Sequence, residues 1–299
     1  MGIIIAVLLF SFIIIFHELG HFLLAKKNGI RVDEFSLGLG PTLLGKQIGE
    51  TKFSLKLLPF GGACMMGEDD ADDLSEGSFN SKSVWARMSV VAAGPIFNLI
   101  LACVFCFILI MITGYRSPEI TGVLDGYSAQ EEGLQAGDVI TEINGRNVHI
   151  WDDVSLYTMT HADEAPFKVE YERDGKKYTA KLEPRQLEGD AAPLLGVTSG
   201  DIVKPGIFKS VEYSIYKVKY WMNYTVDSLR MLVTGQAGLK DLSGPVGIVN
   251  AVDDMYQEAA PAGFGVVMLS MMNFGVLLTT NLGILNPYRH WTEDDLFFL

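Results

Sequence analysis

The sequence has few cysteines and no excess of basic residues. Its three cysteines, Cys64, Cys103 and Cys106, are too few and too scattered for a disulfide framework. Cys103 and Cys106 form a C-x-x-C, but this pair lies in an apolar run with no further ligand nearby, which predicts packing within a helix. Lys and Arg number 23 against 36 Asp and Glu, and the formal net charge of −13 argues against a nucleic-acid partner.

Long apolar runs dominate what is present. Hydrophobic residues make up 49% of the 299 residues and charged residues 20%, a mixture typical of a membrane protein with a soluble insert. Three segments, 1–24, 85–114 and 263–286, hold stretches that are long and apolar enough to span a bilayer as helices. The first lacks the basic start and the A-x-A cleavage site of a signal peptide, so we interpret it as a retained span.

Basic residues indicate how the chain is oriented in the membrane. Those that flank the segment between the first two spans are Lys26, Lys27, Arg31, Lys82 and Arg87. At the other end of the second span only Arg116 lies close. Because basic residues favour the cytoplasmic side, 25–84 is predicted to be cytoplasmic and 115–262 extracytoplasmic.

The segments between the spans differ in character. Residues 31–68 alternate apolar and polar positions and are broken by glycine and proline, which predicts short strands and tight turns beside the membrane helices. In 116–204 we expect helices at 129–133 and 151–160, a strand at 138–143 with an Asn144-Gly145 turn, and a hairpin around Asp174-Gly175. These elements predict one small α+β domain.

The linker 205–244 is amphipathic at helical spacing and rich in Tyr and Trp. Such a helix can lie on the membrane surface or pack against the soluble domain. The sequence leaves both alternatives open.

Two histidines and a glutamate interrupt the first apolar run. His17 and His21 stand four residues apart, so on a helix they present two nitrogens to one point, as zinc requires. Glu18 can take a proton from an attacking water and pass it to a leaving amine. H-E-x-x-H is a short motif with many chance matches. Ionisable residues at mid-bilayer cost at least ~2.5–3.5 kcal/mol each, so we favour a zinc site over a His–Glu pair that only seals helix contacts.

Several further motifs carry a family resemblance. FHELGHF is followed by FSLGLGP, LLPFGGACMMGED, AGPIFNLILA, LSGPVGI and NLGILN. Together they resemble the site-two protease family of intramembrane zinc metalloproteases, and most closely its bacterial branch that cleaves membrane-bound anti-sigma factors. GLQAGDVITEING resembles the PDZ domain that this branch carries outside the membrane.

The resemblance implies roles for individual residues. His17 and His21 would ligate Zn²⁺ and Glu18 would be the general base, while Asn98 and Asn286 correspond to asparagines near the site that would contact substrate. The strand-rich 31–68 segment would be a membrane-associated sheet that receives an unwound substrate by edge pairing. The PDZ domain would select substrates through a groove for which we propose Gly126, Tyr127 and Ser128.

The C-terminal tail departs from the family. There the third metal ligand is an aspartate in N-x-x-P-x-P-x-L-D-G, but here Asn286 is followed by PYRHWTEDDLFFL. One choice of codons for 287–299, read in a shifted frame, gives VPALDGGRLVFL, which suggests a missing or frameshifted C-terminal part. Zinc held by two ligands is bound weakly, so we expect little or no activity from this chain. The alternative is a non-catalytic pseudoprotease that captures partners through its PDZ domain.

The predicted fold is a membrane α-helical protein with three apparent spans of a four-span core, a membrane-associated β element and an inserted α+β PDZ domain. It would be a multi-pass protein of the cell membrane, with the PDZ domain extracytoplasmic. Its partners would be membrane lipid and transmembrane substrates such as anti-sigma factors or signal-peptide remnants. The predicted segments are 1–24, 25–84, 85–114, 116–204, 205–244, 263–286 and the aberrant tail 287–299.

Overall fold

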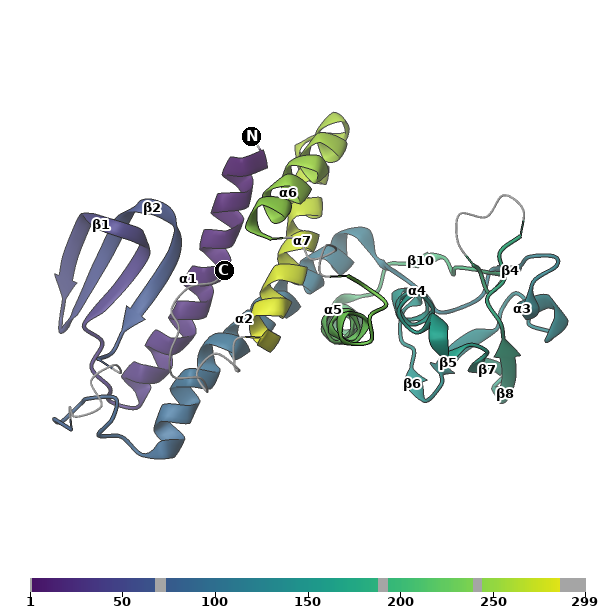
Figure 1. Cartoon of the computed structure of the whole chain (residues 1–299), viewed down its shortest axis with the longest axis horizontal. Coiled ribbons are helices and arrows are strands. Elements are labelled where there is room, and N and C mark those ends of the chain that lie inside the picture. Colours follow the sequence, from purple (N-terminus) through teal and green to yellow (C-terminus); the bar gives the residue numbers. More distant parts are fainter. Residues whose placement is uncertain (1, 68–73, 188–192, 239–243, 286–299) are drawn as a thin grey trace. The chain divides into compact units, whose positions relative to one another are not determined.

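The structure is a computed structural model that describes residues 2–67, 74–187, 193–238 and 244–285 (Figure 1). It divides into two compact units, which we describe separately. The first comprises Met1–Phe105 with Lys240–Leu299, and the second comprises Cys106–Leu239. The long helix α2 (Val84–Thr113) runs from the first unit into the second.

Long apolar helices form the first unit. They are α1 (Gly2–Lys27), α2 and α7 (Phe264–Leu285), and each is long and apolar enough to cross a membrane. This confirms the three predicted apolar helices. Apolar side chains also point outward from α1, including Ile4, Leu8 and Phe12, as expected of a helix surrounded by lipid.

Glycines allow the helices of the first unit to approach closely. A Cβ on Gly20 of α1 would lie 2.6 Å from the backbone oxygen of Ala93 on α2, so only glycine fits there. Ile13, Leu101 and Leu278 form a buried cluster contributed by α1, α2 and α7. Such contacts through small residues are how helices associate where lipid removes the hydrophobic driving force.

A further helix, α6 (Pro245–Ala259), precedes α7 and was not predicted. It contributes Val252 to a buried cluster with Ala6 of α1 and Met271 of α7. The signal that could have identified it is Pro245 directly after Gly244, because proline is favoured in the first turn of a helix.

Two long, bent strands, β1 (Glu34–Ile48) and β2 (Thr51–Met65), form the sheet that lies beside α1 in Figure 1. The register pairs 34–37 with both 62–65 and 52–55, and 44–48 with 51–55. Within the described part of the chain, 62–65 pairs with 34–37 alone and is therefore an edge of the sheet. Phe35 and Cys64 pack with Ala25 of α1 and Val90 of α2.

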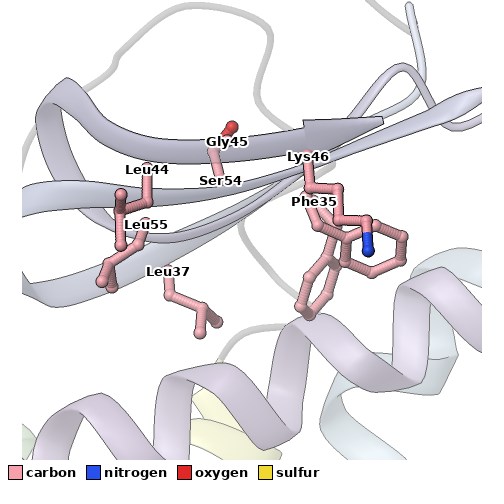
Figure 2. Close-up of a pocket in the computed structure, with 8 residues that line it drawn as sticks. Phe35, Leu37, Leu44, Gly45, Lys46, Ser54 and Leu55 are labelled. Carbon is pink, nitrogen blue, oxygen red and sulfur yellow. The ribbon is translucent and has the colours of Figure 1, made fainter. Parts of the chain in front are cut away.

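A largely apolar groove of about 360 Å³ lies on this sheet. In Figure 2, Leu44 and Leu55 lie at one end, and Phe35 lies beside Lys46 at the other. None of the predicted site residues that the structure describes lines it.

The second unit contains an α+β domain. Its four-stranded antiparallel sheet has the order β6 (Arg146–Asn147), β5 (Val139–Ile143), β7 (Phe167–Arg173) and β8 (Lys176–Leu182). Short pairs join β3 (Tyr115–Arg116) to β10 (Ile202–Val203) and β4 (Gly122–Val123) to β9 (Val197–Thr198). The helices are α3 (Ser128–Glu131) and α4 (Trp151–Thr160), followed by a short 3₁₀ turn, Ala162–Glu164.

The local predictions for this domain are confirmed. Asn144 and Asp174 both have positive φ, 47° and 49°, and each precedes a glycine of positive φ, as tight hairpin turns require. The predicted helix 151–160 coincides with α4, and Phe167–Arg173 pairs with Lys176–Leu182. Ile140, Ile143, Phe167 and Leu182 make up part of the buried core.

The linker forms one long helix, α5 (Ile207–Val233). Its polar side packs on the α+β domain, where Arg146 donates two hydrogen bonds to Asp227, at 2.6 and 2.9 Å. Packing on the soluble domain is thereby confirmed. A row of apolar side chains at helical spacing remains exposed on α5: Phe208, Val211, Ile215, Met222, Val226 and Val233. That this row contacts a membrane surface stays a prediction.

Candidate metal centre

His17 and His21 converge within α1. Their Nε2 atoms lie 3.2 Å apart, the rings meet edge to face at 79°, and both side chains are buried. Two imidazole nitrogens bound to one tetrahedral zinc ion at about 2.0–2.1 Å would be about 3.3 Å apart. The predicted pair therefore already has the spacing of zinc ligands.

Gly94 of α2 provides the space in front of both nitrogens. A Cβ at this position would lie 2.4 Å from Nε2 of His21 and 2.6 Å from Nε2 of His17. Any other residue would put an atom where a shared ion must sit. Gly94 was not among the predicted site residues, although a glycine inside an apolar helix, directly before Pro95, is a signal of close approach.

Two groups from α2 lie within hydrogen-bond distance of the Nδ1 atoms, on the sides of the imidazole rings away from Gly94. Nδ1 of His21 lies 2.7 Å from the backbone oxygen of Val90. Nδ2 of Asn98 lies 3.0 Å from Nδ1 of His17, and the Asn98 side chain is fully buried. Thr279 of α7 donates a hydrogen bond to the backbone oxygen of Asn98 at 3.0 Å. Such outer partners orient histidine ligands and set which nitrogen faces the metal.

The structure thus places Asn98 against the outer side of His17, on the nitrogen away from the space beside Gly94. Its predicted contact with substrate stays a prediction. Asn286 and the tail 287–299 lie outside the described residues.

Glu18 of α1 lies close to the sheet. It is half-buried, and a Cβ on Gly62 would lie 3.5 Å from Cγ of Glu18. Gly62 belongs to the edge segment 62–65. The candidate general base and a strand edge therefore meet at one place, which is what cleavage of an edge-paired peptide requires.

The donor set suits zinc, which takes imidazole nitrogen readily. Among the described residues no three His, Cys, Asp or Glu side chains form a group that could hold a metal ion. Within this part of the chain, His17 and His21 remain the predicted pair of ligands.

The predicted groove residues of the second unit are engaged within the domain. The backbone N–H of Gly126 donates to Oε1 of Gln130 at 2.9 Å, and Tyr127 is buried. The Ser128 hydroxyl donates to the backbone oxygen of Glu183 at 2.8 Å and accepts from its N–H at 3.0 Å. A peptide-binding role for this loop stays a prediction.

Comparison with known proteins gives matches over most of the chain. The profile of Peptidase family M50 matches residues 5–287. A Clostridium acetobutylicum protein named as a zinc metalloprotease is 37% identical over 285 residues, which cover 95% of this chain and 81% of that protein. "Regulator of sigma-W protease RasP" of Bacillus subtilis is 28% identical and is matched over 84% of its length by 94% of this chain.

A match to solved structures covers a smaller part. The crystal structure of the PDZ domain of an SdrC-like protein from Listeria monocytogenes is matched over 88% of its length by 28% of this chain. The sequence identity is 24% and the TM-score is 0.24.

Proposed function

The chain belongs to peptidase family M50, whose relatives are named zinc metalloproteases, and from this premise we propose that it cleaves membrane-spanning proteins within the bilayer. The observation that carries the proposal is the pair of Nε2 atoms of His17 and His21, 3.2 Å apart beside Gly94 in an apolar helix. Packing alone gives no reason to leave that space in front of two buried imidazoles.

In this proposal His17, His21 and Glu18 of α1 have separate roles. His17 and His21 would hold a zinc ion, which would supply a water of lowered pKa and polarise the scissile carbonyl. Glu18 takes the proton from the attacking water and delivers it to the amide nitrogen that leaves. The surrounding apolar helices keep bulk water out, which strengthens these electrostatic interactions.

The sheet edge presents the substrate. A transmembrane helix hides its peptide bonds in its own hydrogen bonds, so it must unwind before hydrolysis. Pairing with the edge 62–65 would satisfy the freed backbone groups and hold the chain extended beside Glu18. A Cβ on Gly62 would lie 3.5 Å from Cγ of Glu18, and this proximity supports the arrangement.

We further propose that the α+β domain is a PDZ domain outside the cytoplasm that selects substrates. The sigma-W name of the Bacillus subtilis relative makes anti-sigma factors a candidate substrate class, and signal-peptide remnants are another. The strands 34–65 would lie against the membrane on the cytoplasmic side.

The test separates zinc binding from catalysis. In detergent or vesicles, His21→Ala should abolish zinc binding, whereas Glu18→Gln should keep zinc and lower the rate of cleavage of a transmembrane peptide about 10²–10⁴-fold. Glu258→Gln, an exposed change on α6, is the matched control and should alter neither. Because little activity is expected from a chain with two zinc ligands, the same measurements are made on a version in which VPALDGGRLVFL replaces residues 287–299 and supplies the aspartate of the L-D-G motif.

Chelator-sensitive cleavage that depends on Glu18 supports the peptidase. If neither version cleaves while both still capture a membrane partner with and without Glu18, the chain is a pseudoprotease and the proposal fails.

A further inference from the structure

The exposed apolar row of α5 is a surface feature that the proposed function leaves unused. Its members follow one another in steps of three, four or seven residues, so they share one side of the helix. The two ends are the most exposed, Phe208 at 91% and Val233 at 89%. At a rise of about 1.5 Å per residue, the row is roughly 37 Å long. A continuous apolar surface of this extent indicates contact with a partner.

The polar side of α5 is already occupied by the α+β domain. Lys217 forms an ion pair with Asp152 at 3.0 Å, and the ring of Tyr216 stacks on that of His149 with centroids 3.9 Å apart. Together with the Asp227 pair, these contacts hold the helix by this side. The apolar row lies outside them and stays exposed, so its partner must be a surface other than this domain.

The start of α5 is attached to the end of the second apolar helix. The stretch of α2 that is long and apolar enough to cross a membrane ends at Thr113. Two residues before that end, the sulfur of Met111 accepts a hydrogen bond from the Ser210 hydroxyl at 3.1 Å, and both residues belong to the second unit. At about 1.5 Å per residue, Met111 lies roughly 3 Å inside the end of the helix. Ser210 is therefore level with the boundary at which α2 would leave the bilayer.

Two further contacts support this junction. The rings of Tyr115 and Tyr213 stack with centroids 3.7 Å apart, and Tyr115 pairs with Val203 where β3 meets β10. A Cβ on Gly114 would lie 2.6 Å from the backbone oxygen of Val203, so the segment that leaves α2 touches the segment that enters α5. Tyrosine is enriched where membrane and water meet. The apolar row therefore begins at that interface.

We propose that α5 is an anchor in the plane of the membrane, whose apolar row enters the bilayer surface at which α2 ends while its polar side carries the α+β domain. The partner is lipid, because the row begins at the level where a neighbouring span leaves the bilayer. A helix of this kind buries its apolar side about 5–10 Å deep, between the headgroups and the acyl chains. The two alternatives for the linker then hold together, one for each side of the helix.

Nitroxide labels on the full chain in phosphatidylcholine vesicles test this proposal. In a chain whose three cysteines are changed to Ala, Ile215→Cys and Val226→Cys each place one label in a different half of the row. Lys176→Cys on β8 places a label at an exposed control position. Labels on the row should collide more often with oxygen, which concentrates in lipid, than with a water-soluble nickel chelate. The label at position 176 should show the reverse.

Charges in the row supply a second test. Val211→Glu combined with Met222→Glu should raise the collisions of the Ile215→Cys label with the nickel chelate to the level seen at position 176, because a charge is costly to bury in lipid. Lys181→Glu, an exposed change on β8, is the control and should leave these collisions unchanged.

Four results would overturn the proposal. Collision rates on the row equal to those at position 176 would show that the row faces water, and low rates with both reagents would show that protein covers it. Strong dipolar coupling between labels on two chains would show that the row pairs with a second copy. Lipid contact at position 215 without lipid contact at 226 would show that α5 rises out of the bilayer. None of these measurements depends on zinc binding or cleavage, so the proposed function is tested separately.

Discussion

At the scale of single residues, the candidate centre depends on glycine, which has no side chain, at position 94. Gly94 lies so close to His17 and His21 that a Cβ would come within 2.4–2.6 Å of both Nε2 atoms. Its backbone is part of α2, where alanine is ordinarily favoured over glycine by about 1 kcal/mol. A glycine here is therefore explained by the space it leaves and not by helix formation.

We expect Gly94→Ala to abolish zinc binding while the helix stays intact. The added methyl group occupies the position of the ion or forces the imidazoles apart. Chelator competition measures the loss, which should exceed the roughly 10–100-fold effect of an outer partner. Gly265→Ala in α7 is the control, because a Cβ there meets open space. Unchanged zinc affinity of Gly94→Ala would refute this account of the site.

At the scale of elements, ion pairs hold α5 against the α+β domain. Asp227 of α5 is almost fully buried and lies 2.6 Å from Nη1 of Arg146, and Thr160 Oγ1 lies 3.4 Å from it. Hydrogen bonding to Asp227 raises the pKa of the Arg146 guanidinium, so this side chain keeps its positive charge. Arg230, one turn further along α5, donates to Asp163 at 3.0 Å.

Asp227→Ala should release α5 from the domain. Removing one partner leaves a half-buried Arg146 charge without its carboxylate, at a cost of about 3 kcal/mol. Faster hydrogen exchange of the α5 amides is the readout. Lys168→Gln, which removes an exposed pair with Glu170, is the control and should leave the exchange of the α5 amides unchanged. Native exchange rates in Asp227→Ala would show that apolar packing alone holds the helix.

The Arg146→Met and Asp227→Leu double variant distinguishes attraction from desolvation. Replacing both charges with apolar groups should recover much of the stability lost in Asp227→Ala, because no charge is then left unpaired. A double variant as unstable as Asp227→Ala would contradict this reasoning.

At the scale of the whole molecule, the distribution of charge predicts which parts lie on each side of the membrane. The basic residues close to the ends of the first two spans lie mostly on the side of the segment between them, and the α+β domain follows the second span. The strands 34–65 and the α+β domain would then lie on opposite sides.

Cysteine labelling in intact cells tests this orientation. In a chain with Cys64, Cys103 and Cys106 changed to Ala, Lys176→Cys should react with a membrane-impermeant maleimide in whole cells. Glu76→Cys should react only after lysis, and both positions are exposed. The reverse pattern would show that the basic residues do not set the orientation of this chain.

Much of the local structure was predictable from neighbouring residues. The three apolar helices follow from uninterrupted hydrophobic runs, and the turns at Asn144-Gly145 and Asp174-Gly175 follow from residues that tolerate positive φ. The spacing of His17 and His21 likewise places both rings on one face of a helix. Helix α6 was not predicted, and the sequence left two alternatives open for the linker. In both cases an amphipathic pattern shows that one face of a helix is apolar but does not show which surface that face contacts.

The sequence by itself therefore determined the spans, the hairpin turns and the pair of histidines, since each depends on residues a few positions apart. Only the tertiary structure brought Gly94 and Asn98 to the histidines and the edge 62–65 to Glu18. Those contacts join residues 44 to 81 positions apart, and helix packing through glycines decides which of them meet. Periodicity specifies which face of a helix is buried, but the partner of that face is set by the packing of the whole unit.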